Sequence, residues 1–472
     1  MKLSHLWLCT LNSNDLDQEI HSYIKSLLTR STLVDSMKII LIGNGAREHI
    51  IAEKLAEDSD VYAIMSKKNP AIAKLCKGYW IADITNPNAI SEILGNIKKE
   101  KIQLAFSSPD ATLAAGISDV LEEHGLFVAS PSKKGSRIEW DKQFMRELME
   151  KHQINGRVMN KVVTTKSDAE QTIREYVNVA VKPIGLTCGK GVKVSKDHFP
   201  KIEDAIDYAN EWIEKDGKVL IEEELRGEEF TFQAFSDGQT ITTMPPVQDH
   251  KRAFVGDTGP NTGGMGSYST GKLLPFLSQK DLDNAREIMQ KVITALNTEG
   301  HKFVGVLYGQ FMLTKDGPKV IEFNARFGDP EAINVLALLK TSLYKVFLSM
   351  AKGKLCEVKF DKKCTVVKYL VPEGYPDNPK KDQEVSIEGA VENGRAKVYY
   401  ASVYEKDGKI YTTSSRAFAI LGVADTLEDA EKIAEEGCKN VKGPVWHRED
   451  IGTKELVQKR IEHMEKIRGL NS

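Results

Sequence analysis

The chain has 472 residues, and its 65 basic and 67 acidic side chains give a net charge of −2. A chain of this length is too long for one hydrophobic core, so two to four domains are expected. The balanced charge provides no electrostatic basis for binding nucleic acid or a membrane surface. The six cysteines form no C-x-x-C pair, and no apolar run approaches the roughly 18 residues of a membrane span. We therefore predict a reduced, cytoplasmic protein without a cysteine metal site.

Residues 1–36 differ from the rest of the chain. Their apolar run around Trp7 is too short for a secretory signal, and acidic residues from Asp15 to Glu19 argue against a transit peptide. The first strong strand pattern starts directly after Met37. We predict an extension that folding does not need, such as one produced by a gene start placed too far upstream. The alternative is an N-terminal helix that packs on the body.

A chain that begins at Met37 is therefore expected to fold and to turn over substrate like the full-length protein. The physical reason is that the first core element of the pattern is the strand after Met37. Thermal unfolding and activity of the two chains, measured side by side, test this. A marked loss of Tm or activity would favour the packed helix instead.

A strand pattern at 38–42 is followed by Gly43-Asn44-Gly45-Ala46-Arg47-Glu48-His49 and a helical pattern at 50–56. Such a turn places free N–H groups at a helix N-terminus, where an anion can bind. Glu48 replaces the third glycine of a dinucleotide fingerprint, and Ser66-Lys67-Lys68 stands where an acid for the ribose is required. We favour a phosphate-bearing substrate over NAD, with a purely structural turn as the alternative.

Strands at 104–106 and 127–129 alternate with a helix at 111–124, so residues 37–135 predict a doubly wound parallel sheet. The turns 43–49 and 107–110 then lie at the carboxyl ends of the strands, where such sheets bind ligands. A helix at 136–152 is predicted to start with a capping box from Ser136 and Glu139. Lys142 lies beside the inward stripe of this helix, so it either meets an anion or snorkels to solvent.

A glycine-rich segment, 183–194, follows a strand at 179–182. It is predicted to be a flap whose N–H groups and lysines, Lys182 and Lys190, cover phosphates; a plain hairpin is the alternative. It is not a Walker loop, because Gly191 stands where Ser or Thr is required. The acidic run 222–229 joins two strand patterns and would otherwise be solvated charge. The long polar loops 245–254 and 259–266 predict a substrate loop.

A hairpin is predicted from the strands 303–314 and 321–326. Its second strand places Glu322, Asn324 and Arg326 on one face. The carboxylate and amide oxygens suit Mg²⁺, and the guanidinium suits a phosphate or carboxylate. The alternative is an ordinary salt-bridged sheet face. Helices are expected at 281–296 and 330–351. Strands from 364 to 423 with a helix at 427–441 predict a small α+β domain.

Taken in order, these segments resemble the ATP-grasp superfamily. Their sequence motifs resemble those of the phosphoribosylamine–glycine ligase family within it. The resemblance runs almost continuously from Met37 to Gly452. It is carried by G-N-G-A-R-E-H (43–49), G-K-G-V (189–192), E-E-x-L-x-G-E-E (222–229), P-P-V-Q-D-H-K-R-A-F (245–254), G-P-N-T-G-G-M-G (259–266), E-F-N-A-R-F-G-D-P-E (322–331), S-R-A (415–417) and R-E-D-I-G (448–452). The two long loop motifs are the most specific.

The resemblance implies an α/β protein with an N-terminal doubly wound parallel-sheet domain (37–136), after the extension 1–36. A central ATP-grasp domain (137–352) with a mobile lid (about 158–227) and a small C-terminal α+β domain (353–472) would follow. It also implies ligation of glycine to 5-phosphoribosylamine through a glycyl phosphate, with ATP as co-substrate and Mg²⁺ or Mn²⁺ as cofactor. A monomer or weak dimer in de novo purine biosynthesis is implied.

The same resemblance assigns the site. Metal binding would fall to Glu322, Asn324 and Gln310, and catalysis to Arg326, Lys251 and Asp249. ATP would be bound by Lys142, Lys182, Gly189, Lys190, Gly191, Glu222, Glu223, Glu224, Leu225 and Glu229. The other substrates would be bound by Gly43, Asn44, Gly45, Arg47, Glu48, Pro109, Asp110, Thr262, Gly263, Gly264, Met265, Gly266, Asp329 and Pro330.

Gln310 departs from the superfamily pattern, because many ATP-grasp enzymes have a metal-binding acid near this position; it is a weak third ligand or none. Two other functions stay open. One is an ATP-grasp ligase or carboxylase that acts on a different carboxylate. The other is a nucleotide-binding or NAD-dependent protein, which would bind nucleotide without ligation.

Overall fold

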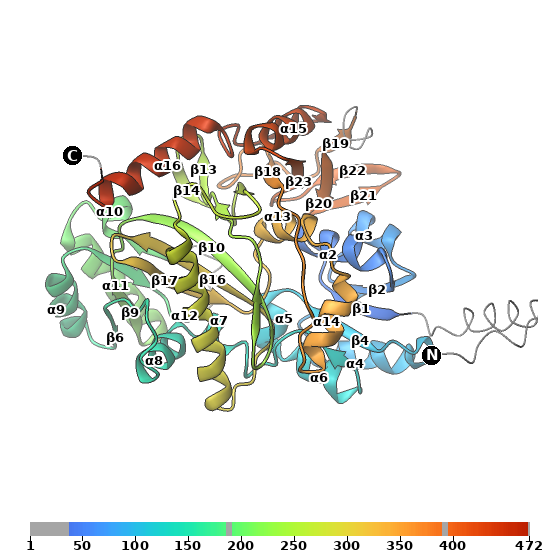
Figure 1. Cartoon of the computed structure of the whole chain (residues 1–472), viewed down its shortest axis with the longest axis horizontal. Helices are drawn as coiled ribbons and strands as arrows, with labels where there is room; N and C mark the ends of the chain where they lie inside the picture. Colours follow the sequence, from blue (N-terminus) through green and yellow to red (C-terminus); the bar gives the residue numbers. More distant parts are fainter. Residues whose placement is uncertain (1–36, 186–190, 389–394, 471–472) are drawn as a thin grey trace, which may run out of the picture. The chain divides into compact units, whose positions relative to one another are not determined.

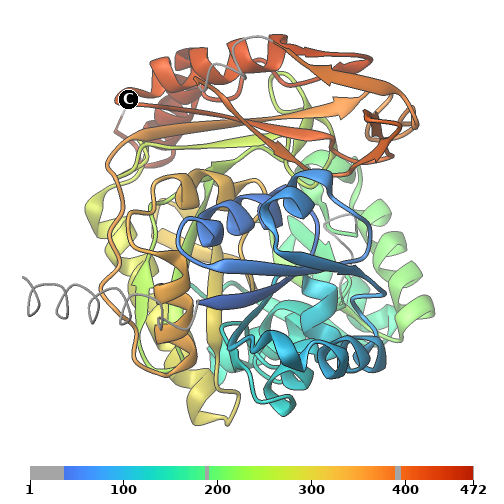
Figure 2. The same ribbon diagram turned by 90° about the vertical axis from the view of Figure 1, so that its right-hand side faces the viewer.

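The computed structural model describes residues 37–185, 191–388 and 395–470. The chain divides into two compact units, Met1–Met37 and Lys38–Ser472. The predicted N-terminal extension lies outside the described residues. Figures 1 and 2 show the second unit from two directions. No helix in the described part of the chain is both long and apolar enough to cross a membrane.

The N-terminal part of the second unit is a five-stranded parallel sheet in the order β3-β2-β1-β4-β5. Its strands are β1 (Lys38–Ile42), β2 (Asp60–Met65), β3 (Gly78–Ile81), β4 (Leu104–Ser107) and β5 (Phe127–Val128). Its helices are α2 (Ala46–Ala56), α3 (Pro70–Leu75), α4 (Pro87–Asn96), α5 (Asp110–Ala115) and α6 (Ile117–Glu123), with a short 3₁₀ turn at Lys98–Glu100. Residues 39–42 are fully buried, as expected for a strand covered on both faces. This confirms the predicted doubly wound sheet.

The central part is built on a four-stranded antiparallel sheet in the order β11-β10-β16-β17. These strands are β10 (Glu228–Asp237), β11 (Ile241–Thr243), β16 (Val304–Thr314) and β17 (Gly317–Asn324). The helices beside them are α7 (Arg137–Trp140), α8 (Lys142–Lys151), α12 (Gln279–Thr298), α13 (Glu331–Ala337) and α14 (Leu343–Ala351). The predicted hairpin is therefore confirmed. Its register shifts after Gln310, so that Ile321 is an extra residue in β17.

A second antiparallel sheet, β6-β9-β7-β8, forms the segment that we call the lid, residues 160–223. It contains β6 (Asn160–Val163), α9 (Lys166–Tyr176), β7 (Val179–Lys182), β8 (Lys193–Val194), α10 (Ser195–His198), α11 (Ile202–Asp216) and β9 (Val219–Glu223). Helices α9 and α11 lie side by side (Figure 1) and pack on the sheet. A buried cluster from Val163 to Ile221 belongs to the lid alone. The lid thus has its own core.

The C-terminal part contains two more sheets. Its elements are β18 (Cys364–Pro372), β19 (Glu384–Ile387), β20 (Lys397–Tyr400), β21 (Val403–Lys406), β22 (Lys409–Thr412), β23 (Phe418–Ala424), α15 (Leu427–Lys439), β24 (Val441–Lys442), β25 (Val445–Trp446) and α16 (Lys454–Ile467). Strands β12 (Gln248–Asp249) and β15 (Gly266–Ser269) join the sheet of β18. Between them, β13 (Arg252–Phe254) and β14 (Thr258–Asn261) form a hairpin. The predicted substrate loop is therefore built into the C-terminal sheet.

Three predicted helices are wrong in detail. The helix at 136–152 is broken at Asp141, whose side chain accepts from Phe144 N and caps α8, and Ser136 makes no capping hydrogen bond. Glu139 bonds elsewhere, so the predicted capping box does not form. The helix at 111–124 is split by Gly116, which has a φ of +84°. The helix at 330–351 is split into α13 and α14.

Candidate active site

The face of β17 predicted to bind metal carries two side chains with oxygen atoms, Glu322 and Asn324. Glu322 and Asn324 are both half-buried, whereas Phe323 between them is buried. Among the described residues, neither side chain has a hydrogen-bond or ion-pair partner. Gln310 lies directly opposite Glu322 on β16. The described residues contain no group of three or more His, Cys, Asp or Glu side chains that could hold a metal. One carboxylate with amide oxygens fits a Mg²⁺ ion that takes its other ligands from water and phosphates.

Two lysines reach this region from other elements. Lys142, at the start of α8, is buried and donates from Nζ to the Gly185 carbonyl oxygen at 2.9 Å. Burial lowers the pKa of Lys142, although the nearby Glu322 charge opposes this. Lys182, at the end of β7, pairs through Nζ with Glu222 Oε2 at 2.7 Å. Lys142 therefore does not snorkel to solvent; its ammonium is directed inward.

Glu222 is held by two cations. Arg146 Nε lies 2.6 Å from Glu222 Oε1, and the Arg146 guanidinium also donates to the carbonyl oxygens of Val320 and Ile321. Glu222 and Arg146 are both about 3% exposed. Burial alone would raise the pKa of Glu222, but Arg146 and Lys182 hold it below its ordinary value. This carboxylate therefore fastens the lid strand β9 to α8 and to the extra residue of β17.

Three residues predicted to bind ATP, Glu223, Glu224 and Leu225, directly follow Glu222 in the chain. Glu223 accepts at Oε1 from Met159 N at 2.9 Å, and Glu224 accepts at Oε2 from Lys196 N at 3.2 Å. Leu225 is half-buried between β9 and β10. Gly189 and Lys190 lie outside the described residues, and the Gly191 carbonyl oxygen accepts from the Tyr208 hydroxyl at 3.0 Å.

Glu229 on β10 links the face predicted to bind metal to the predicted substrate loop. Its Oε2 accepts from Gln310 Nε2 at 2.6 Å and from Lys251 Nζ at 3.2 Å. Burial alone would lower the pKa of Lys251, but the carboxylates of Glu229 and Glu322 and then Asp249 raise it. Lys251 therefore stays charged and lies within electrostatic range of Glu322.

Arg326 follows β17 and pairs with Glu139, which the sequence analysis assigned to a helix capping box. Its Nε lies 3.1 Å from Glu139 Oε1, and Glu139 Oε2 accepts from Ala325 N at 2.8 Å. Burial alone would lower the pKa of Arg326, but Glu139 and then Asp110 raise it. Asp110 is a predicted substrate residue at the start of α5, in the N-terminal part. The two domains therefore share one cluster of charges.

The two predicted turns of the N-terminal sheet meet, as expected. Glu48 accepts at Oε2 from Gly45 N at 2.6 Å and at Oε1 from the Ser108 hydroxyl at 2.6 Å. Arg47 pairs with the same carboxylate and donates to the Phe327 carbonyl oxygen at 3.0 Å. Glu48 thus closes the turn at the position of the missing third glycine.

Gly43, Asn44 and Pro109, which were also predicted to bind substrate, have contacts of their own in this region. Gly43 has a φ of +127°, and a Cβ there would lie 2.6 Å from Glu48 Cγ and 3.2 Å from Pro109 Cδ. Asn44 accepts at Oδ1 from Ser66 N at 3.2 Å. Any side chain at Gly43 would therefore collide within the turn, which leaves the backbone free for a ligand's approach.

Asp249 on β12 is half-buried and lies beside Glu331, which is buried. Burial and then the neighbouring Glu331 carboxylate raise the pKa of Asp249 well above its usual value. Glu331 is 2% exposed and accepts at Oε1 from the Tyr308 hydroxyl at 2.8 Å. A Cβ at Gly264 would lie 2.7 Å from both Asp249 Oδ1 and Pro330 Cδ. The segment 259–266 is therefore in close contact with Asp249 and with Pro330, the residue before Glu331.

Arg416, from the C-terminal part, holds the rest of this loop. It donates from Nη1 to the carbonyl oxygens of Gly263 and Gly264 at 2.6 and 2.9 Å. Its Nη2 lies 3.1 Å from Asp329 Oδ2, and the Tyr369 hydroxyl donates to Asp329 Oδ1. Asp329 is thus occupied by Arg416 and Tyr369.

The other predicted loop residues have structural partners too. Thr262 donates through its hydroxyl to the Lys251 carbonyl oxygen at 2.8 Å. Met265 is fully buried, and a Cβ at Gly266 would lie 2.2 Å from the Val367 carbonyl oxygen. Met265 N donates to the His250 carbonyl oxygen, and the Gly266 carbonyl oxygen accepts from His250 N, so structural hydrogen bonds hold this end of the loop.

Sequence reasoning missed the residues that hold the predicted ones in place. These are Glu139, Arg146, Tyr308, Glu331, Tyr369 and Arg416. Glu331 and Arg416 stand inside motifs that carry the family resemblance, which was the available signal for them. Arg146 and Tyr308 had no signal, because each pairs with a residue far away in the sequence.

Taken together, a lid sheet and a central antiparallel sheet present lysines toward a strand with a free carboxylate and amide, next to an N-terminal parallel sheet. This fold and site define an ATP-grasp ligase. Profiles of the phosphoribosylglycinamide synthetase family match the N domain at 37–139, the ATP-grasp (A) domain at 140–332 and the C domain at 365–454.

Known proteins resemble the chain along most of its length. A phosphoribosylamine–glycine ligase of Methanosarcina barkeri is 50% identical over 440 residues, 92% of this chain and 100% of that relative. The Pyrococcus abyssi ligase is 46% identical over 435 residues, 91% of this chain and 98% of that relative. The crystal structure of the Thermotoga maritima ligase has a TM-score of 0.74 and 26% identity, covering 88% of this chain and 100% of that one. The chain belongs to the phosphoribosylamine–glycine ligase family.

Proposed function

We propose that this protein joins glycine to 5-phosphoribosylamine at the expense of ATP, giving glycinamide ribonucleotide, ADP and phosphate. The observation that carries the proposal is the free carboxylate of Glu322 among Lys142, Lys182 and Lys251. Glu222 and Glu229, the acids that contact Lys182 and Lys251, are already paired with cations. A site that collects positive charge around one unpaired acid suits a phosphate chain with a divalent cation.

The protein's own residues would hold ATP. Lys142 and Lys182 would face the α- and β-phosphates, and the backbone of 223–225 would meet the adenine, with Glu229 on the ribose hydroxyls. Glu322 and Asn324, with Gln310 as a weaker ligand, would hold Mg²⁺ or Mn²⁺. When bound, the ion would neutralise phosphate charge that repels the glycine carboxylate.

Two transfers make up the reaction. A glycine carboxylate oxygen would attack the γ-phosphorus and release ADP; Arg326 would stabilise the charge on the transferring phosphoryl group. The amine nitrogen of 5-phosphoribosylamine would then attack the acyl carbon and release phosphate. Asp249, with its raised pKa, would accept the proton that the amine loses, and Lys251 would stabilise the leaving phosphate. The lid would exclude water from the acyl phosphate.

The turns 43–48 and 109–110, on the N-terminal sheet, would bind the phosphoribosyl group. They lie at the carboxyl ends of β1 and β4, where the strand order reverses. The loop 262–266 with Asp329 and Pro330 would enclose glycine. We further propose a cytoplasmic monomer or weak dimer with a mobile lid.

The test is ADP release with ATP and Mg²⁺, with and without glycine and freshly made 5-phosphoribosylamine. We expect release to depend on both, with nearly one glycinamide ribonucleotide formed per ADP and a small excess of phosphate from hydrolysis of the acyl phosphate. If another carboxylate supports turnover instead, the protein is a different ATP-grasp ligase or carboxylase. If ATP binds and no carboxylate supports turnover, the protein is a nucleotide-binding protein.

Replacing both Gly189 and Gly191 by alanine is expected to raise the KM for ATP several-fold and to leave folding intact. The two residues allow the backbone to approach phosphates, and alanine limits that approach. Steady-state kinetics at varied ATP, with thermal unfolding as the folding control, measure this. Unchanged ATP kinetics would show that the segment is an ordinary hairpin.

A further inference from the structure

One arginine of the substrate loop, Arg252 on β13, extends to the lid. Its guanidinium pairs with Asp197 on α10, and its Nη1 donates to the Gly259 carbonyl oxygen at 2.8 Å. The side chains of Arg252 and Asp197 are 22% and 38% exposed. Within the described ranges, this is the only ion pair that joins the lid to residues 248–261.

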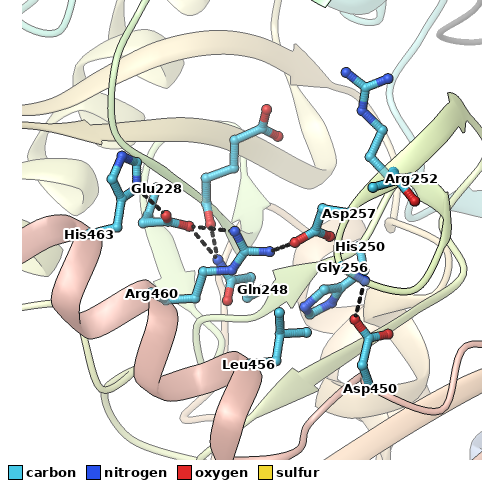
Figure 3. Close-up of polar contacts among 12 residues, drawn as sticks. Glu228, Gln248, His250, Arg252, Gly256, Asp257, Asp450, Leu456, Arg460 and His463 are labelled. Atoms are coloured by element: carbon cyan, nitrogen blue, oxygen red, sulfur yellow. Dashed lines mark hydrogen bonds and ion pairs between the residues drawn. The ribbon is translucent and has the colours of Figure 1, made fainter.

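The hairpin that carries Arg252 is fixed to the C-terminal part by a buried arginine. Arg448, which is fully buried, donates from Nη1 to the Arg252 carbonyl oxygen and to Asp257 Oδ1, both at 3.0 Å. It also pairs with Asp450, which accepts from Gly256 N at 2.9 Å (Figure 3). Because these bonds hold the backbone on both sides of the hairpin turn, Arg252 projects from a rigid base.

The same base extends to the strand that carries Glu229. Figure 3 shows Arg460 of α16 between Asp257 and Glu228, with His463 on the far side of Glu228. Arg460 Nη1 lies 3.4 Å from Glu228 Oε2, and its Nη2 pairs with Asp257. Glu228 is 4% exposed. The hairpin, α16 and β10 are therefore one connected unit of paired charges.

His250 completes the base without adding charge. It lies beneath Asp257 in Figure 3, is 1% exposed, and neither ring nitrogen has a partner among the described residues. Burial, followed by the charges of Arg460 and Arg448, lowers the pKa of His250 to about 3. A neutral imidazole leaves the carboxylates of this cluster to the arginines.

We propose that Arg252 is a positioning residue for ligation: its pair with Asp197 holds the lid closed over the neighbouring Lys251 while the acyl phosphate exists. The inference rests on the proposed function, because an acyl phosphate must be shielded from water. Opening the lid separates the sheet of β9 from the hairpin, and this pair breaks. A partly exposed ion pair is a modest interaction, yet it shifts an open–closed equilibrium several-fold.

The experiment compares phosphate released with glycinamide ribonucleotide formed. Arg252→Gln and Asp197→Asn are each expected to raise the excess of phosphate over product about fivefold, the upper range for one such pair. The charge-swapped protein, Arg252→Asp with Asp197→Arg, should regain most of the wild-type ratio of product formed to phosphate released. Lys166→Gln is the matched control, because it removes an exposed lid pair with Glu214 that does not face the loop.

A second measurement tests the effect of the Arg252–Asp197 pair on the lid independently of ligation. With Mg²⁺ and a non-hydrolysable ATP analogue, amide exchange in α10 and α11 should be faster in Arg252→Gln than in the wild type and in Lys166→Gln. If the wild type forms no product, the proposed function fails. The exchange comparison still decides whether the Arg252–Asp197 pair holds the lid closed. The proposal would be overturned if Arg252→Gln had the wild-type ratio of product to phosphate and the wild-type amide exchange rate. It would also be overturned if the charge-swapped protein recovered neither.

Discussion

Glu322→Gln is expected to lower kcat about 10²-fold or more, the scale on which one preorganised electrostatic group acts. The substitution keeps the shape of the side chain and removes one charge from the ligand set of the proposed metal. The dissociation constant for ATP should change much less, because Lys142 and Lys182 would still hold the phosphates. Charge neutralisation matters most as the phosphoryl group transfers, so the rate suffers more than the affinity.

Single-turnover rates and ATP binding by calorimetry separate these two effects, and excess Mg²⁺ should rescue the variant only in part. Asp316→Asn is the matched control, because it removes an exposed carboxylate from the turn of the same hairpin. Wild-type turnover of Glu322→Gln would mean that β17 presents an ordinary polar face. The metal site and the ligase assignment would then have to be abandoned.

The parts of the fold that were predictable from the sequence have local causes. The buried run before Gly43 and the alternation around Phe323 each report which faces of one strand are covered. The hairpin of β16 and β17 follows from two such patterns and a short turn. Where two local signals competed, prediction was wrong: Asp141 caps α8 in place of Ser136, and Glu139 was thereby freed for Arg326.

The rest of the site depends on contacts between distant residues. Arg146 reaches Glu222 across 76 residues, and Arg416 reaches Gly263 across 153. Neither pair leaves a periodic pattern, because a single contact between distant residues places one residue on each element. Sequence reasoning could therefore propose groups that would touch ATP, but it gave no account of the residues that hold those groups in position. The extra residue at Ile321, which turns backbone carbonyl oxygens toward Arg146, gave no signal either.

Glu222→Gln tests the most deeply buried of these pairs and is expected to cost about 3–5 kcal/mol of unfolding free energy, the usual loss when one partner of a buried ion pair is removed. Arg146 and Lys182 would remain in the interior without their shared anion. Chemical denaturation at neutral pH measures the loss. Glu214→Gln is the control, since its exposed pair with Lys166 lies on the same lid and its loss should leave the unfolding free energy almost unchanged.

The pH dependence of this loss has a defined sign. The pKa of Glu222 is lowered in the folded protein from its ordinary 4.5. Its ion pairs therefore stabilise the fold fully above about 4.5, and this contribution is lost as the pH falls through the folded pKa. The stability gap between wild type and Glu222→Gln should be constant near neutrality and should narrow below about pH 4.5. A gap that is small at pH 7, or that widens in acid, would show that Arg146 and Lys182 do not depend on this carboxylate.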